Sequence, residues 1–335
     1  MPKKRKRTSL GAYVQHLSPA TSTTTTTTNL NLSAYHPDLD LSFFPTSSQS
    51  LYHSLLPHAL VHPSTFPASH LKYWRHRHSL LSLYSSGCLL DEQSWYSITP
   101  ESVAFRIAKR CSTDRTVVDL FAGAGGNAIQ FAFTCAKVIA VELDEVKLKL
   151  ARWNAMVYGV EDRIVFVQGD SLGLLKAMVQ RREKGGGGDE VVWKGLTASQ
   201  LDDVQAVFLS PPWGGVDYAA QPTTPSLEQS NYHLSSIQPI DGLSLFAQVT
   251  QAFHTNNIAF YLPRNTSLSE LSHLTTLLDP ARSSSSSSST SSNTKMDVKI
   301  EYQYVNNGKK LSSLTAYYGD LASDWDDDTD DWRKT

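Results

Sequence analysis

Long apolar runs, paired cysteines and metal-binding spacings are all missing from this sequence. Its three cysteines, Cys88, Cys111 and Cys135, form neither a Cys-x-x-Cys pair nor a disulfide framework, which predicts a reduced intracellular compartment. No apolar run approaches the roughly 20 residues that span a bilayer. No signal-peptide pattern follows the basic start, so we expect a soluble protein.

Histidine is concentrated in one region, since seven of the eleven histidines lie between His36 and His78. Their spacings are irregular and no cysteine lies close by, whereas zinc sites use short, regular intervals of histidine and cysteine. The sequence therefore predicts no metal site.

Charge and composition divide the 335 residues into tails and a folded middle. Residues 2–7 are Pro-Lys-Lys-Arg-Lys-Arg, which is typical of a nuclear import signal or a nucleic-acid contact, so we expect a nuclear or nucleolar location. Residues 8–50 are rich in Ser, Thr and Asn, which predicts disorder. The predicted parts are a disordered tail (1–50), a helical extension (51–110), a main domain (111–321) with insertions near 183–200 and 281–294, and an acidic tail (322–335). The tails are candidate sites for protein partners that the sequence does not identify.

A glycine-rich turn is the first functional signal. Residues 117–120 predict the end of a buried strand, residues 128–133 predict the start of a helix, and Gly123, Gly125 and Gly126 lie between them. This arrangement is typical of the nucleotide-binding corner of a doubly wound sheet, where glycine lets a ligand lie against the backbone. Dehydrogenases, kinase-like folds and methyltransferases share it.

Acidic residues at three predicted strand ends narrow the choice of ligand. A carboxylate at Asp119 would repel a pyrophosphate but suits the sulfonium and ammonium of S-adenosylmethionine, although it could instead cap a helix. Glu142 follows at a distance suited to ribose hydroxyls. Asp170 is placed to meet the adenine amine, or else to form a turn after glycine. We predict S-adenosylmethionine as the cofactor.

Predicted strands and helices alternate along the main domain. The strands are expected over residues 117–120, 138–141, 164–167, 204–209, 257–262, 298–304 and 314–318. The helices are expected over residues 72–84, 100–109 with Thr99 as cap, 144–158 with Asp144 as cap, 172–182 and 243–255. The fold class predicted is α/β, a class I S-adenosylmethionine-dependent methyltransferase. Its seven-stranded sheet is doubly wound and mostly parallel, with an antiparallel C-terminal hairpin and a small helical N-terminal extension.

The second motif, Ser210-Pro-Pro-Trp-Gly-Gly, is more specific than the glycine turn. Its prolines fix the backbone, so nearby carbonyls become oriented acceptors. A planar base with an exocyclic amine would donate to the Ser210 hydroxyl and the Pro211 carbonyl while Trp213 holds its plane. The large indole favours a cationic or electron-poor base. Catalysis would then be alignment for an in-line methyl transfer without a dedicated base. A structural Pro-Pro turn with a buried Trp is the alternative.

These two motifs, together with residues 144–159, 261–265 and 315–320, resemble the trimethylguanosine synthases. Members of that family methylate N2 of 7-methylguanosine caps on small nuclear and nucleolar RNAs, and the resemblance spans roughly residues 71–321. It implies that Trp213 stacks on the cationic 7-methylguanine and that Asn154 reaches the base or the cofactor region. The remaining residues that it implies are Lys72, Tyr218, Arg264 and Asn265 at the cap, and Thr99, Pro100 and Asn127 at the cofactor.

The chain departs from the family pattern at three places. Glu142 stands where Asp is frequent, and Glu145 stands where proline is common. Leu80 and Leu81 occupy a segment in which relatives offer an aromatic ring for the opposite face of the cap base. Two other functions stay open from the residues alone. One is methylation of adenine N6 or another exocyclic amine in RNA or DNA, and the other is catalytically silent cap or RNA binding through the basic N-terminus.

Overall fold

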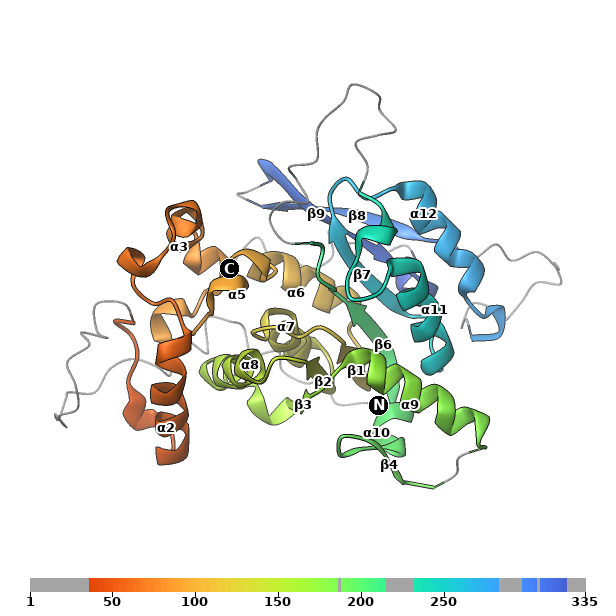
Figure 1. Ribbon diagram of the computed structural model, residues 1–335, viewed down its shortest axis with the longest axis horizontal. Helices are drawn as coiled ribbons and strands as arrows, with labels where there is room; N and C mark the ends of the chain where they lie inside the picture. Colours follow the sequence, from red (N-terminus) through yellow and green to blue (C-terminus); the bar gives the residue numbers. More distant parts are fainter. Residues whose placement is uncertain (1–35, 186–187, 215–231, 283–296, 306–307, 324–335) are drawn as a thin grey trace, which may run out of the picture.

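The computed structural model describes residues 36–185, 188–214, 232–282, 297–305 and 308–323 (Figure 1). Its main sheet has seven strands: β1 (Thr116–Asp119), β2 (Lys137–Glu142), β3 (Ile164–Gln168), β6 (Val204–Leu209), β7 (Ile258–Pro263), β8 (Lys299–Val305) and β9 (Lys310–Tyr317). Their order is β3-β2-β1-β6-β7-β9-β8. The five strands from β3 to β7 in this order pair in parallel, whereas β9 is antiparallel to both β7 and β8. The predicted fold class is confirmed.

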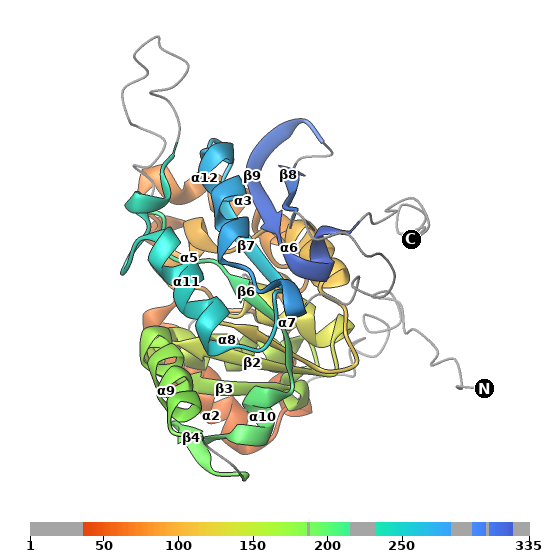
Figure 2. The same ribbon diagram turned by 90° about the vertical axis from the view of Figure 1, so that its right-hand side faces the viewer.

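Helices cover both faces of this sheet, as Figure 2 shows from the side. The helices are α6 (Glu101–Arg110), α7 (Gly126–Thr134) and α8 (Glu145–Val157) on one face, and α9 (Ser171–Glu183) and α11 (Gly242–Ala252) on the other. Successive strand residues alternate between the two cores, so Val117 packs in the first and Val118 in the second. Burial on both faces explains why the strands read as continuous apolar runs. Within the described ranges, no helix combines the length and apolarity needed to cross a membrane.

Regular secondary structure begins earlier in the chain than we predicted from the composition. Helix α2 (Thr46–Leu55) begins inside the stretch expected to be disordered and runs past its predicted end at residue 50, and Tyr52 on this helix is fully buried. The rings of Phe44 and Tyr52 each lie with their centroids 4.9 Å from that of Trp153 on α8. Isolated aromatic residues in a polar segment give little local signal, but here they are buried against a distant helix. The predicted boundary at residue 50 was therefore wrong for residues 36–50.

The helix predicted over residues 72–84 is broken into α3 (Leu71–Arg75), α4 (Arg77–Leu80) and a short 3-10 turn. The break is at His76, whose ring nitrogen Nδ1 lies 2.8 Å from the carbonyl oxygen of Lys72. That oxygen is the one that the His76 amide would reach in a continuous helix, and the amide donates to Tyr73 instead. A side-chain hydrogen bond thus replaces a backbone one.

The stretch 183–200, predicted as a low-complexity insertion, contains regular structure among its described residues. Strands β4 (Val191–Trp193) and β5 (Leu196–Thr197) form a small antiparallel pair that leads into α10 (Ala198–Asp202) through a capping box at Thr197. The Trp193 ring fills the space above Gly169, where an added Cβ would lie 2.4 Å from it. The prediction missed this hairpin because its anchor is a glycine about 25 residues away.

Other expected elements agree closely with the structure. Helix α8 is capped by Asp144, whose carboxylate accepts from the amides of Val146 and Lys147. Thr99, in contrast, does not cap α6, because the N-cap position is Pro100 and no side-chain cap hydrogen bond is present. The Thr99 hydroxyl has a different partner, which belongs to the candidate site.

One buried amide joins the N-terminal extension to the main domain. Asn154 on α8 has no exposed surface, and its Oδ1 accepts from the amide of Leu89 at 2.8 Å. Its Nδ2 donates to the carbonyls of Leu89 at 2.9 Å and Ala124 at 3.0 Å. A single side chain therefore fixes the extension to the glycine turn.

Replacing Asn154 should separate these two parts of the structure. The Asn154→Ala change leaves buried backbone groups of Leu89 and Ala124 unsatisfied, and each such group costs about 1–3 kcal/mol. We expect the free energy of unfolding to fall by about 3 kcal/mol, measured by thermal or urea denaturation. As a control, Arg152→Ala on the same helix removes only an exposed ion pair to Glu161 and should cost less than about 1 kcal/mol. Equal losses in both variants would contradict this role for Asn154.

Candidate active site

The parallel strands all end at one edge of the sheet, and the predicted site residues gather there. Asp119 ends β1, Glu142 ends β2, Asp170 follows β3, Ser210 follows β6 and Arg264 follows β7. In open α/β sheets this carboxyl edge is where ligands bind. The topology thus brings together residues that are up to 145 positions apart in the sequence (264 − 119).

Asp119 is fully buried at the centre of this edge. Its Oδ1 accepts from the amide of Phe121 at 3.2 Å, while Oδ2 has no hydrogen-bond partner among the described residues. Burial raises the pKa of the Asp119 carboxyl to about 7, with the Phe121 amide opposing the shift and the charge of Glu142 adding to it. A buried acceptor without a partner, near the glycine turn, suits a cationic ligand such as a sulfonium or ammonium group.

Glu142 holds the glycine turn in place. Its Oε2 accepts from the amide of Gly123 at 2.8 Å and its Oε1 accepts from the amide of Asp144 at 2.9 Å. An ionised carboxylate has about four acceptor positions, so the hydroxyls of a ribose can still be bound. Gly125 has a φ of 90°, and an added Cβ would lie 3.0 Å from Ala151, so this turn needs glycine both for its backbone conformation and for space.

The segment around Thr99 closes over the glycine turn. Thr99 is buried, and its Oγ1 accepts from Nδ2 of Asn127 at 2.9 Å. Ile98 lies so close to Gly126 that an added Cβ there would be 2.7 Å from it. The Oδ1 of Asn127 is buried and lacks a hydrogen-bond partner in the described part of the chain, so it is available to a ligand donor.

Gln130, one turn further along α7, was not predicted as a site residue. It is 1% exposed, and its Oε1 also has no hydrogen-bond partner among the described residues. Asn127 and Gln130 are three residues apart, so their side chains share a face of α7. The available signal was a polar residue at a buried helical position, directly after the turn.

Asp170 lies at the third strand end, as predicted, and also caps a helix. Its Oδ1 accepts from the amide of Leu172 at the start of α9. The side chain is exposed, and the hairpin residue Trp193 packs on the adjacent Gly169. The structure thus gives Asp170 a local role as the N-cap of α9, which neither sequence interpretation included, and its position at the strand end still suits the adenine amine.

The Ser-Pro-Pro-Trp motif follows β6 beside Asp119. The Ser210 hydroxyl donates to the carbonyl of Phe121 at 3.4 Å, which leaves its oxygen able to accept. Trp213 is half-buried, and its ring centroid lies 5.1 Å from that of the buried Tyr261. The Tyr232 hydroxyl donates to the Trp213 carbonyl at 3.2 Å. Tyr261 and Tyr232 were not predicted, and they hold Trp213 by its ring and by its backbone carbonyl, respectively. Trp213 also packs against both hydrophobic cores.

A polar hollow of about 370 Å³ opens beside this motif. Its lining residues are Arg264, Asn265, Thr266, Ser267, Leu268, Ser269 and Tyr302. The Tyr232 amide donates to the Asn265 carbonyl, so the hollow and the Trp213 motif share a structural support. The exposed guanidinium of Arg264 donates to the carbonyl of Leu311 at 3.2 Å. Arg264 and Asn265 are therefore placed where a polar or anionic part of a substrate can enter.

Other predicted cap-binding residues have different outcomes. Lys72 is exposed on α3, and Tyr218 lies outside the described residues. Asn154 does not face a ligand, because it is fully buried and its amide already serves Leu89 and Ala124. The resemblance implied that Asn154 reaches the base or the cofactor region. Its bond to the Ala124 carbonyl places it at the glycine turn of the cofactor region, where it supports the backbone.

The departure from the family pattern at residues 80 and 81 also has a structural outcome. Leu80 and Leu81 are both buried, with 8% and 1% of their surface exposed. Neither side chain can therefore cover the second face of a bound base.

The raised pKa of Asp119 predicts a pH-dependent affinity for a cationic cofactor. Below about pH 7 the carboxyl is protonated, so S-adenosylmethionine must displace a proton to bind. The Kd for S-adenosylmethionine should therefore rise by up to about tenfold for each unit by which the pH falls below 7. Titration calorimetry between pH 5.5 and 8, in buffers of different ionisation enthalpy, should detect the released proton.

The Asp119→Asn variant is the control for this pH effect. It keeps the shape of the side chain but should bind the cofactor weakly and without proton release. An affinity of the unaltered protein that does not vary between pH 5.5 and 8 would contradict the proposed role of the Asp119 charge.

Comparison with known proteins agrees with this geometry. Residues 114–321 match the family model described as RNA cap guanine-N2 methyltransferase. The trimethylguanosine synthase of Schizosaccharomyces pombe is 35% identical over 222 residues, which cover 65% of this chain and 80% of that protein. The trimethylguanosine synthase of Saccharomyces cerevisiae is 32% identical over 212 residues, which cover 61% of this chain and 58% of that protein.

A solved structure supports the fold separately. A crystal structure of a proposed methyltransferase from Porphyromonas gingivalis W83 is similar, with a TM-score of 0.51 and 11% identity, over 84% of this chain and 60% of that chain. The family and the fold together indicate an enzyme that uses S-adenosylmethionine to methylate N2 of a cap guanine. With most of the main domain matched, this chain belongs to the RNA cap guanine-N2 methyltransferase family.

Proposed function

We propose that this protein converts the 7-methylguanosine caps of small nuclear and nucleolar RNAs to 2,2,7-trimethylguanosine. The observation that carries the proposal is the position of the Ser-Pro-Pro-Trp motif, which follows the strand next to the one that ends in Asp119. A base held by Trp213 and a cation held by Asp119 would lie at the same sheet edge. The name of the two yeast relatives supports the trimethylated product.

The residues at the other strand ends fit S-adenosylmethionine, whose sulfonium supplies an electrophilic methyl group when it is bound. Asp119 offers to the positive charge of the donor a buried oxygen that has no hydrogen-bond partner in the described part of the chain. Glu142 would accept from the ribose hydroxyls, and Asp170 from the adenine amine. Asn127 and Thr99 would enclose the methionine end, because they are joined to each other above the glycine turn.

The base side of the site needs orientation more than proton transfer. The Ser210 hydroxyl already donates to the Phe121 carbonyl, so its oxygen can accept from the exocyclic amine, as can the carbonyl of Pro211. Accepting both N–H bonds fixes the amine and directs its lone pair toward the donor. This alignment supplies most of the rate acceleration, and the proton can leave to water after transfer.

Charge decides which guanine is accepted. Trp213 is half-buried, and its indole would offer a π-face to the 7-methylguanine ring, which carries a positive charge that unmodified guanine lacks. Arg264 and Asn265 line the adjacent hollow and would receive the cap phosphates or sugar. The basic run at residues 2–7 supports a nuclear or nucleolar site of action.

Substitution of Trp213 tests this selectivity. Stacking and cation–π attraction in a partly dry site amount to about 2–3 kcal/mol. We therefore expect Trp213→Ala to lower kcat/KM for 7-methyl-GTP about 30- to 150-fold, and Trp213→Phe to lower it about fivefold. Mass spectrometry of the methylated nucleotide gives the rates and shows whether one or two methyl groups are added.

The matched substrate for this experiment is GTP, which lacks only the N7 methyl group and its charge. The unaltered enzyme should leave GTP almost unmethylated. Equal turnover of both nucleotides would refute cap selectivity, and product carrying the new methyl group on another nucleoside position would refute the reaction itself.

A further inference from the structure

One region of the chain carries positive charge and no negative charge. Asp and Glu make up 32 of the 335 residues, so a stretch of 50 residues would hold about five, yet residues 41–90 contain none. The same stretch contains Lys72, Arg75 and Arg77 together with six histidines. The net charge of −2 for the whole chain conceals this local excess of positive charge.

The structure concentrates these residues on the outer face of α3 and α4. Lys72, Arg75, His76 and His78 are exposed there, and Arg77 lies over the Trp74 ring with its guanidinium carbon 4.7 Å from the centroid. Within the described ranges, none of the three Lys and Arg residues forms a salt bridge. We call this surface the α3–α4 face. No carboxylate of the described chain lies within salt-bridge distance of its Lys and Arg nitrogens.

This face packs on a buried aromatic cluster and is linked to the helix that follows Thr99. Trp74, on the inner side of α3, packs against Phe66, Tyr84 and Trp95, with ring centroids 5.5, 5.6 and 5.9 Å away. After α4, the Ser82 hydroxyl donates at 2.8 Å to the carboxylate of Glu101. Glu101 begins α6, two residues after Thr99, which closes over the glycine turn.

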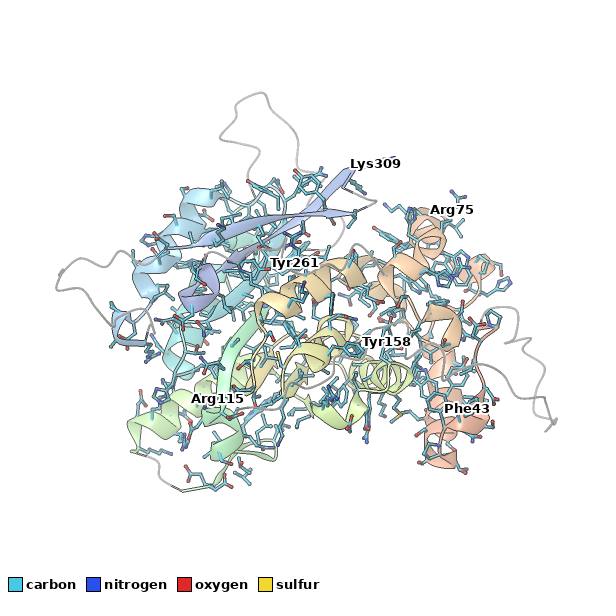
Figure 3. All side chains as sticks on the ribbon, turned by 180° about the vertical axis from the view of Figure 1, so that it is seen from behind. Phe43, Arg75, Arg115, Tyr158, Tyr261 and Lys309 are labelled. Carbon is cyan, nitrogen blue, oxygen red and sulfur yellow. The ribbon has the colours of Figure 1, made fainter. Side chains whose placement is uncertain are left out.

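The α3–α4 face also lies at the end of the molecule where the C-terminal hairpin projects. Figure 3 shows Arg75 at the outer edge of the N-terminal extension and Lys309 of the hairpin at the same end, with Arg115 at the opposite end. Figures 1 and 2 agree in placing α3 and the β8–β9 hairpin at this upper end. A chain that leaves the Arg264 hollow, which Tyr302 of β8 also lines, therefore has a basic surface at the same end of the molecule.

We propose that the α3–α4 face binds the phosphates of the RNA chain that follows the cap. The inference rests on the proposed function and extends it from the cap nucleotide to the body of the RNA. An unpaired basic surface attracts a polyanion because binding releases condensed counterions. The large hydrophobic side chains that the structure records as exposed do not include any on α3 or α4, so insertion into a lipid surface is not favoured.

Arg75 provides the sharpest test, because it is exposed and is not part of the candidate active site. The full-length protein is compared on two substrates, 7-methyl-GTP and a 7-methylguanosine-capped RNA of about 20 nucleotides. For Arg75→Glu we expect KM for the capped RNA to rise about tenfold and KM for 7-methyl-GTP to stay unchanged. The salt dependence of RNA binding, as the slope of log Kd against log salt, should fall by about one.

Two further variants separate charge from structure. Arg75→Lys keeps the charge and should retain nearly the full affinity for capped RNA. Lys176→Glu reverses a charge exposed on α9, on the other face of the sheet, and should alter neither substrate. Fluorescence anisotropy with labelled capped RNA measures binding directly, so the result does not depend on turnover.

The outcomes distinguish this inference from the proposed function. If Arg75→Glu binds capped RNA as tightly as the unaltered protein, or if Lys176→Glu weakens it equally, the α3–α4 face is not the RNA site. Tighter RNA binding by Arg75→Glu would indicate that the acidic segment at residues 324–331 binds this face in place of RNA, and would also overturn the inference. If the unaltered protein binds RNA through Arg75 but does not methylate 7-methyl-GTP, only the proposed function fails.

Discussion

Asp119 carries a carboxylate that is fully removed from water, and one of its oxygens has no hydrogen-bond partner among the described residues. Burying such a group is unfavourable, which is why its pKa rises to about 7. A buried carboxylate of this kind is retained where a bound ligand stabilises it, and a cation does so most directly. The surrounding elements position this one group: β1 carries it, Glu142 fixes the glycine turn next to it, and Ser210 follows the neighbouring strand.

The N-terminal extension completes the site instead of forming a separate module. Its residues enter the same hydrophobic core as α6, α7 and α8. The Asn154 side chain links the backbone of the extension, at Leu89, to the glycine turn, at Ala124. The Thr99 hydroxyl accepts from the Asn127 side chain on α7. Movement of the extension would therefore disturb the cofactor side of the site directly. This coupling also gives the α3–α4 face a fixed position relative to the cap site, as a surface that guides an RNA chain requires.

The two sides of the site use different physical devices. The proposed cofactor side has buried polar atoms that lack hydrogen-bond partners in the described chain, at Asp119, Asn127 and Gln130. The proposed cap side has the half-buried indole of Trp213, with Tyr261 beside it, and a polar hollow at Arg264. Desolvated acceptors favour a cationic group, whereas an aromatic ring and a guanidinium suit a larger ligand that carries phosphates.

The sequence alone determined the features that depend on local pattern. Apolar runs followed by Asp119, Glu142 and Gln168 identified the strands, because strands buried on both faces need continuous apolar residues. Asp144 and the spacing after it identified α8, because a cap and an apolar stripe are local signals. The glycine turn and the Ser-Pro-Pro-Trp motif indicated a nucleotide-type cofactor and a base with an exocyclic amine, and the family resemblance that they carry indicated the cap guanine.

Only the tertiary structure decided the contacts between residues that are distant in the chain. It showed that Asn154 supports a backbone turn and does not reach the base, that Thr99 pairs with Asn127 and does not cap α6, and that His76 divides a predicted helix. It also placed Trp193 on Gly169 and Tyr261 behind Trp213. Such contacts leave no periodic signal in the sequence, since each depends on which side chains meet once the sheet and its helices have packed together.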